Sequence, residues 1–273
     1  MSLKGYIKEN LPWIRSIYRK RLAPINLIHN IFDKPVVVLL YHRVNYLNRD
    51  LFNINVTPDN FERHIRILKN NYNVITFNDL KRNDIKEPSV IITFDDGYYD
   101  NYKYAFPILK KYQVPATIFI TSGGVDTGKE FWWDRLETVL FENKNLRESI
   151  ELDILNQRHI FDVSDDKKRL HSFYTLHHML FSLHPNERDM MLDRWYESYG
   201  LNVNPNNRTM TSSELIELYQ SQLVTLGAHT IHHPALKQIS REEQIHEIQS
   251  SKLFLENLLH TDIDIFAYPF GHK

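Results

Sequence analysis

Two adjacent carboxylates, Asp95 and Asp96, follow an apolar run at positions 90–94 and precede Gly97. If the run is a strand, the two acids point to opposite sides of it. They therefore cannot form the facing carboxyl pair, ~5 Å or more apart, that a glycoside hydrolase needs. One acid can instead bind a metal ion while the other faces a nearby water. Gly97 permits a tight turn here, but Asp-Asp-Gly turns are also common structural elements, so the motif alone leaves both interpretations open.

Three histidines follow another apolar run, at positions 224–228. His229 and His233 are four residues apart, so one helical turn would bring their imidazoles to the same side. Two imidazoles and a carboxylate suit zinc or a similar divalent ion, and three protein ligands leave a position open for water. His232 is a rival ligand, although it should point away from that turn. Such histidines alone are more often structural; combined with two acids at another strand end, they favour a metal site.

Two further motifs lie at predicted strand ends. His42 comes just past the apolar run at 36–40, and Phe270 lies in the run FAYPFG at 266–271. Either motif could serve packing alone. In α/β barrels, however, catalytic residues lie at the C-terminal ends of the strands, and these motifs occupy such positions.

Short apolar runs that predict strands alternate with patterns that predict helices. The predicted strands are residues 36–40, 74–76, 90–94, 116–120, 224–228 and 265–268. The predicted helices begin at Pro58 behind the N-cap Thr57, cover 102–112, and follow the capping boxes at 211–214 and 240–243. The run at 36–40 is continuous, which predicts a buried strand. The alternation predicts a parallel α/β sheet, most simply a barrel.

Residues 127–208 interrupt this pattern. They are polar and helix-like, with scattered aromatics and no strong strand signal, which predicts a mostly helical insertion in a barrel domain spanning 35–273. Residues 1–34 are expected to form a separate helical segment. The chain stops five residues after the last predicted strand, with no helix to cover it. Either the chain is a fragment or N-terminal elements complete the barrel.

Composition narrows the class of protein. The 273 residues are 42% hydrophobic and 25% charged with a net charge of −1, which excludes a disordered chain and gives no electrostatic reason to expect nucleic acid. The absence of cysteine excludes a disulfide scaffold and a thiolate metal site. No apolar stretch reaches the ~18 residues of a transmembrane helix, and no signal peptide is visible, so a cytoplasmic protein is expected. The basic segment around Arg15–Arg21 predicts an amphipathic helix packed on the domain, with peripheral contact to an anionic membrane as the alternative.

Residues 123–130, GGVDTGKE, nearly match a phosphate-binding loop. The final Ser or Thr of that motif is replaced by Glu130, whose charge would repel a nucleotide phosphate. A loop at the barrel mouth is the better interpretation. Trp132, Trp133 and Asp134 could then contact a sugar ring, or they could be buried against the insertion.

Three motifs together, TFDDG at 93–97, HTxxHP at 229–234 and FAYPFG at 266–271, resemble the polysaccharide deacetylase family, also called carbohydrate esterase family 4 or the NodB-homology domain. The resemblance covers about residues 36–271 without the insertion. It implies a distorted (β/α) barrel that removes acetyl groups from N-acetylated sugars with a divalent metal. Zinc is the expected ion, with nickel, cobalt or iron as alternatives.

The resemblance also implies roles for individual residues. Asp96, His229 and His233 would be the metal ligands, and Asp95 the general base. The backbone N–H of Phe270 would help to hold the oxyanion.

Two departures from the common family pattern concern the C-terminal motifs. Ala267 stands where the family usually has an arginine that tunes the catalytic Asp, and no room remains after Lys273 for the usual general-acid histidine. The chain is similar to the circularly permuted branch of poly-N-acetylglucosamine deacetylases, which carries that histidine before TFDDG. His42 is then the candidate acid.

The expected function is the hydrolysis of N-acetyl groups on amino sugars of a polysaccharide or glycan precursor, so the expected partner is an N-acetylated glycan. A non-catalytic carbohydrate-binding protein on the same fold is one alternative, and a sugar O-acetyl esterase is another. The position of His42 discriminates between the enzyme and the binding protein, because a distant His42 would leave the site without an acid.

Overall fold

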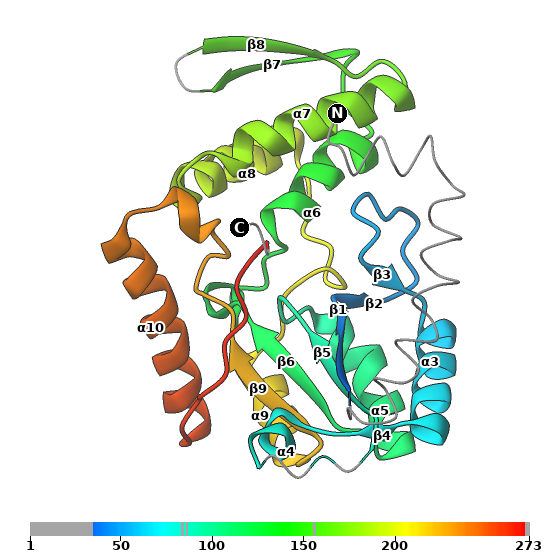
Figure 1. Ribbon diagram of the computed structural model, residues 1–273. Coiled ribbons are helices and arrows are strands. Elements are labelled where there is room, and N and C mark those ends of the chain that lie inside the picture. Colours follow the sequence, from blue (N-terminus) through cyan, green and yellow to red (C-terminus); the bar gives the residue numbers. More distant parts are fainter. Residues whose placement is uncertain (1–34, 83–84, 86, 155–156, 271–273) are drawn as a thin grey trace, which may run out of the picture.

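A parallel five-stranded sheet lies at the centre of the computed structural model, which describes residues 35–82, 85, 87–154 and 157–270 (Figure 1). The strand order is β1-β5-β6-β9, and β4 also pairs with β5. The strands are β1 (Val36–Tyr41), β4 (Asn73–Val74), β5 (Ser89–Phe94), β6 (Ala116–Ile120) and β9 (Val224–Ala228). The predicted helical segment 1–34 lies outside the described residues.

The central strand β5 pairs with β1 along its whole length, so β4 and β6 share its other edge. Ser89 and Val90 pair with β4, and Thr93 and Phe94 pair with β6. All six residues of β5 are buried, as expected for a strand covered on both faces. This strand carries the two predicted carboxylates directly after its last residue.

The closed barrel predicted from the alternation is not found among the described residues. No described strand joins β9 back to β1. The predicted strand 265–268 is reduced to a single bridge between Phe266 and Ala228, which places this segment beside β9. The fold is therefore a mixed α/β fold built on an open parallel sheet.

The strand β1 differs from its prediction as a buried strand. Val37, Val38 and Leu40 are each about half exposed, at 50%, 48% and 54%. A continuous apolar run predicts burial on both faces, but β1 is an edge strand and no described element covers its outer face.

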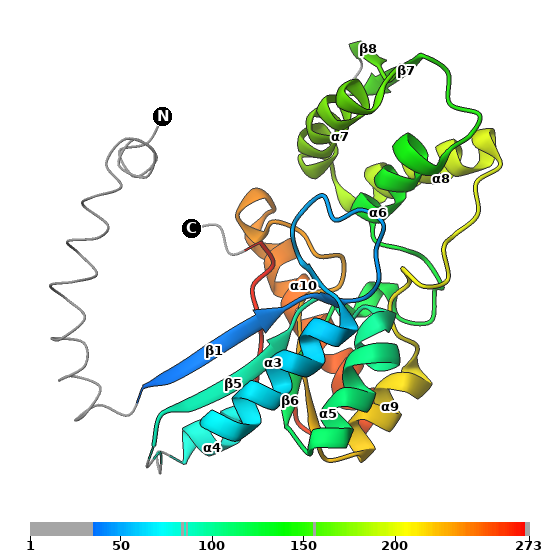
Figure 2. The same ribbon diagram turned by 90° about the vertical axis from the view of Figure 1, so that its right-hand side faces the viewer.

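Helices cover the sheet as the capping signals predict. They are α3 (Pro58–Asn71), α4 (Phe77–Lys81), α5 (Phe106–Tyr112), α9 (Ser212–Gln220) and α10 (Arg241–Leu259). Figure 2 shows α3, α5 and α9 along one flank of the sheet. Both predicted capping boxes are present, with Glu214 and Glu243 each accepting a hydrogen bond from the N-cap backbone N–H, and Thr57 caps α3. The predicted helix 102–112 begins instead with a π-helical turn, η1 (Asn101–Ala105), before Pro107 in the first turn of α5.

The insertion lies above the C-terminal ends of the strands (Figures 1 and 2). Its helices are α6 (Trp132–Glu137), the π-helical η3 (Thr138–Glu142), α7 (Asp166–Phe181) and α8 (Pro185–Tyr199). It also contains an antiparallel hairpin of β7 (Ser149–Ile154) and β8 (Gln157–Asp162), so the expectation of an insertion without clear strands is wrong in this part. Short elements complete the chain: β2 (Arg43–Val44), β3 (Asn55–Val56), η2 (Ser122–Gly124) and η4 (Leu236–Gln238).

Two hydrophobic cores result. One joins the sheet to α3, α5, α9 and α10, and the other joins the insertion, including Trp132 and Trp133, to Tyr98. In the part of the chain that is described, no helix is both long enough and apolar enough to cross a membrane.

Candidate active site

The two carboxylates lie in a tight turn at the C-terminal end of β5. Asp96 and Gly97 both have left-handed backbone, with φ of 75° and 84°. Glycine adopts this conformation at little cost, whereas an aspartate there is unusual and must be held by its surroundings. The backbone carbonyl of Asp96 accepts a hydrogen bond from the Thr121 N–H at 3.2 Å, which ties the turn to the end of β6. The chain thus places the Asp96 side chain at the C-terminal edge of the sheet.

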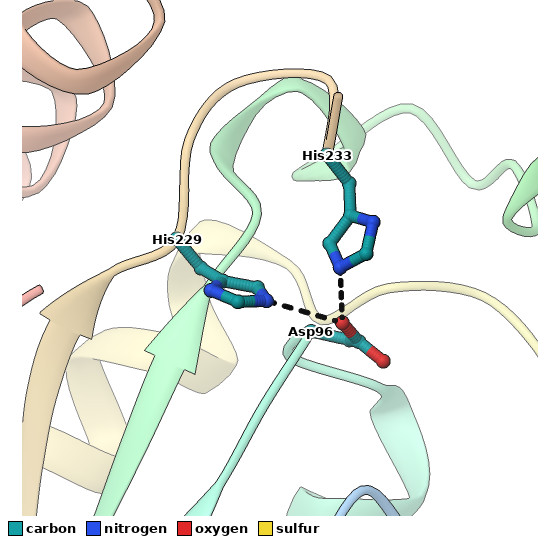
Figure 3. Close-up of side chains that lie close together, drawn as sticks. All are labelled: Asp96, His229 and His233. Atoms are coloured by element: carbon teal, nitrogen blue, oxygen red, sulfur yellow. Dashed lines mark ion pairs between the residues drawn. The ribbon is translucent and has the colours of Figure 1, made fainter. Parts of the chain in front are cut away.

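The histidines lie in a hooked loop after β9 rather than on the helical turn expected from their spacing. Thr230 and His233 both have positive φ, 67° and 52°. The His233 N–H donates to the Thr230 hydroxyl at 3.1 Å, which closes the hook. This loop still turns His229 and His233 toward one point, as Figure 3 shows.

Asp96, His229 and His233 converge on a single carboxylate oxygen. The Asp96 Oδ1 atom lies 3.1 Å from His233 Nε2 and 3.5 Å from His229 Nε2 (Figure 3). All three side chains are buried, and Asp96 Oδ1 has no hydrogen-bond partner among the described residues. Ligand atoms ~2.0–2.1 Å from a tetrahedral zinc ion are about 3.3 Å apart, so the spacing fits one divalent ion. The group could therefore bind a metal.

A second contact orients His229 for this task. Its Nδ1–H donates to the Ala267 carbonyl at 2.9 Å, which directs the unprotonated Nε2 toward Asp96. The position that usually carries an arginine in the family thus contributes its backbone carbonyl here.

Charges in the site reinforce one another. Burial acts to raise the pKa of Asp96, but the nearby imidazoles of His229 and His233 outweigh it and hold the pKa well below its ordinary value. Burial acts to lower the pKa of His229, and the nearby charge of Asp96 reverses this and raises it. Asp96 is therefore ionised at any physiological pH, as a metal ligand must be.

Asp95 lies beside the three residues without belonging to them. It is 9% exposed, and burial raises its pKa while the charge of His229 acts in the opposite direction. A carboxyl whose pKa moves toward neutrality is a better proton acceptor than an ordinary one.

All six residues singled out by the sequence motifs line one cavity of about 290 Å³. They are His42, Asp95, Asp96, His229, His233 and Phe270. The ring of Phe270 packs against that of His233, with centroids 4.5 Å apart. His42 reaches the cavity from the end of β1, and Asn101 holds its backbone carbonyl with a 2.8 Å hydrogen bond. Three different strand ends and one C-terminal segment therefore supply a single site.

The comparisons with known proteins agree with this site. The family model described as polysaccharide deacetylase matches residues 82–145 and 190–273, which include both the Asp-Asp turn and the histidine loop. The chain belongs to the polysaccharide deacetylase family.

Relatives of this deacetylase-family chain match it over limited segments. The Bacillus subtilis protein YxkH is 42% identical over 96 residues, which are 32% of this chain and 33% of that protein. A poly-beta-1,6-N-acetyl-D-glucosamine N-deacetylase of Staphylococcus aureus is 34% identical over 110 residues, 34% of this chain and 38% of that one. The aligned segments thus span little more than a third of these curated relatives.

Solved structures share the fold. IcaB from Ammonifex degensii has a TM-score of 0.55 at 18% identity, covering 88% of this chain and 76% of that one. The polysaccharide deacetylase BC0361 from Bacillus cereus has a TM-score of 0.54 at 20% identity, covering 87% of this chain and 52% of that one.

Four residues of the cavity wall were not predicted as site residues by the motifs. They are Phe52, Ile54, Trp133 and His177. Trp133 was considered as a sugar contact, whereas His177, on α7, carries no sequence signal that separates it from its neighbour His178. The ring of His177 stacks on Trp132 with centroids 4.6 Å apart. The insertion of this deacetylase-family chain therefore contributes directly to the cavity.

A buried polar network supports Trp133 from behind. The Trp133 indole N–H donates to the Tyr98 hydroxyl at 2.7 Å, and that hydroxyl donates to Asp134 at 2.8 Å. Arg43 binds Asp134 and Asp100 at 3.4 and 2.8 Å. Burial raises the pKa of Asp134 to about 7, although Arg43 acts in the opposite direction. Asp134 thus supports the aromatic wall through Tyr98 and does not line the cavity that contains Asp96.

The loop 123–130 is a close-packed loop and does not form a phosphate cradle. A Cβ on Gly123 would lie 2.6 Å from the Ile231 carbonyl, and one on Gly124 would lie 2.7 Å from Thr209. The Gly123 N–H is already bound to Ile231 at 2.9 Å. Glu130 is buried and accepts a 3.0 Å hydrogen bond from Tyr196. Gly123 and Gly124 therefore serve close packing against Ile231 and Thr209.

Proposed function

We propose that this chain is a metal-dependent deacetylase that hydrolyses the N-acetyl group of an amino sugar within a glycan. The observation that carries the proposal is the convergence of Asp96, His229 and His233 beside Asp95 and His42 in one cavity. A binding protein has no use for three buried ligand groups together with a base and an acid.

The metal site assigns one task to each residue. Asp96, His229 and His233 would hold the ion, and zinc is the metal that this donor set suits best, with nickel, cobalt or iron also compatible. A divalent ion there supplies Lewis-acid polarisation of the acetyl carbonyl and acidifies water.

Asp95 accepts a proton from the attacking water as the water oxygen bonds to the acetyl carbon. The Phe270 backbone N–H donates a hydrogen bond to the carbonyl oxygen as negative charge develops on it. His42 gives a proton to the sugar nitrogen as the carbon–nitrogen bond breaks. Acetate and a free amino sugar are the products.

The cavity wall suits a sugar. Trp133, Phe52 and His177 surround the polar floor, and aromatic faces pack well against the apolar faces of pyranose rings. The position of His42 in the same cavity supports the enzyme over the non-catalytic alternative. The proposed substrate is therefore an N-acetylated glycan, and a cytoplasmic location remains an expectation. Membrane contact through residues 1–34 concerns a segment outside the described structure.

The test is acetate release from N-acetylglucosamine oligomers of different linkage, measured with zinc present and beside an O-acetylated sugar. Asp95→Asn should abolish turnover while the protein keeps its metal. Asp153→Asn, an exposed carboxylate on β7, is the matched control and should be fully active.

Release from the ester alone would assign the chain as an O-acetyl esterase. An Asp95→Asn variant with normal activity would contradict the proposed mechanism.

A further inference from the structure

Arg188 on α8 carries a buried guanidinium with no anionic partner. The residue is 4% exposed, yet no hydrogen bond or ion pair joins its side chain to any residue in the described ranges, and its Nε atom is left without an acceptor. The guanidinium lies over the face of Trp132, with its carbon 4.6 Å from the ring centroid. Burial lowers the pKa of Arg188 to about 10, which expresses the cost of holding this charge away from water. A buried charge ordinarily has a partner, so this position lacks one.

A second orphaned donor lies on the residue that Arg188 contacts. The indole N–H of Trp132 is buried, with the residue 3% exposed, and it also has no hydrogen-bond partner among the described residues. Trp132 and Arg188 both line a cavity of about 90 Å³, which is distinct from the cavity that contains Asp96. A single water needs only about 10–15 Å³ of such space, so a group as large as phosphate fits.

The remaining charged side chains around this cavity balance one another. Lys129 and Arg135 also line it, and both bind Asp193, at 3.2 and 2.6 Å. Two carboxyls oppose them, Glu130 and Asp189.

Neither carboxyl neutralises Arg188. Glu130 accepts hydrogen bonds from Tyr196 and Asn207 instead. Asp189 follows Arg188 in the chain but does not form an ion pair with it.

We propose that this cavity is an oxyanion site, in which a carboxylate or phosphate accepts hydrogen bonds from Arg188 and Trp132. The same chemistry is available from an anionic substituent of the glycan or from a free anion. Arg188 also lines a second cavity, of about 150 Å³, whose wall includes His233 and Phe270 of the hydrolytic site. An acidic group on a bound glycan therefore has a path toward Arg188. The matched part of the family model resumes at residue 190, so Arg188 lies outside it.

The test is a thermal titration of the metal-loaded protein with inorganic phosphate, with sodium chloride added to keep ionic strength constant. Phosphate should stabilise the wild type saturably. In Arg188→Met the apparent affinity should fall at least about tenfold, because charge-assisted hydrogen bonds are lost. Arg194→Met removes an exposed arginine of the same helix and should behave as wild type. Without phosphate, Arg188→Met should unfold no earlier than wild type, since an unpaired buried charge has been replaced by an apolar chain.

Trp132→Phe provides an independent variant, because it removes the indole N–H and keeps an aromatic ring. Its phosphate affinity should also fall. An unchanged phosphate response in both Arg188→Met and Trp132→Phe would overturn the proposal, as would the lack of any response in the wild type. These readouts need no deacetylase activity, so they remain decisive if the proposed function fails.

Kinetics then separate the two sources of the anion. Phosphate that raises the KM of acidic glycans, and leaves the KM of neutral ones unchanged, identifies the substituent of the glycan as the ligand. Phosphate that binds without affecting either KM identifies a free anion.

Discussion

The metal site makes the sharpest prediction, because one histidine run contains both a proposed ligand and its control. His233 points at Asp96, with its Nε2 atom 3.1 Å from the carboxylate oxygen. Its neighbour His232 turns away and binds Glu247, with Nδ1 and the carboxylate oxygen 2.7 Å apart. His233→Ala should therefore lose the metal, and His232→Ala should retain it.

The size of the Tm shift expected on zinc binding follows from mass action. The donor atoms already have nearly tetrahedral spacing, at 3.1 and 3.5 Å from Asp96 Oδ1, so little binding energy is lost to rearrangement. Zinc at about 100 times its dissociation constant stabilises a folded protein by about 2.7 kcal/mol. A kilocalorie per mole shifts the Tm of a domain of roughly this size by about 2–4 °C, so zinc should raise the Tm by about 5–11 °C.

The assay combines elemental analysis with thermal unfolding, before and after a chelator. Wild type and His232→Ala should bind about one equivalent of metal and show the full Tm shift. His233→Ala should show neither. One equivalent of metal and an unchanged Tm shift in His233→Ala would refute the assignment of ligands.

Two further predictions concern the insertion and the network behind it. His177→Ala should raise KM for acetylated oligomers about 3- to 10-fold at nearly constant kcat, because burial lowers the pKa of His177 to about 4 and a neutral imidazole can bind a sugar hydroxyl. The exposed neighbour variant His178→Ala should leave KM unchanged, and an equal effect of both would contradict a contact with substrate. Asp134→Asn should flatten the pH dependence of unfolding measured in urea, because Asp134 titrates at about 7 in the folded protein against 3.8 ordinarily. The folded state binds this proton more tightly, so stability on the order of 4 kcal/mol is present below pH 4 and is lost as the pH rises to 7. A variant that keeps the wild-type slope would show that another group causes it.

The site could be predicted from sequence because its parts carry strong local signals. Asp95 and Asp96 end a strand whose residues are all apolar or small, and His229 follows a strand of the same kind. Both strands belong to one parallel sheet, so their C-terminal ends lie along the same edge of that sheet. The starts of the helices can also be predicted, because a capping box is formed by residues within one short segment and satisfies backbone N–H groups there.

Features that depend on distant partners could not be predicted in this way. The edge position of β1 depends on which strands pair, and this cannot be read from the apolar run at 36–40 alone. The run therefore predicts burial on both faces, which β1 does not have. His177 reaches the cavity because α7 packs across Trp132, a contact that no local pattern encodes. The hairpin of β7 and β8 is different. Ile150, Leu152 and Ile154 alternate with exposed residues, and this alternation of apolar and polar side chains is a local signal for a strand.

The two hydrophobic cores support different parts of the site. The core around the sheet holds the strand ends that carry Asp96 and His229, while the core of the insertion presents Trp133 and His177. The matched family segments stop at residue 145 and resume at 190, so they omit about half of the second core and retain most of the first. Substitutions inside the insertion can therefore reshape the chamber above the reaction centre while leaving its chemistry untouched. If the proposed function holds, the preference for one glycan over another can change through the insertion alone, because the residues around Asp96 and His229 are held by the other core.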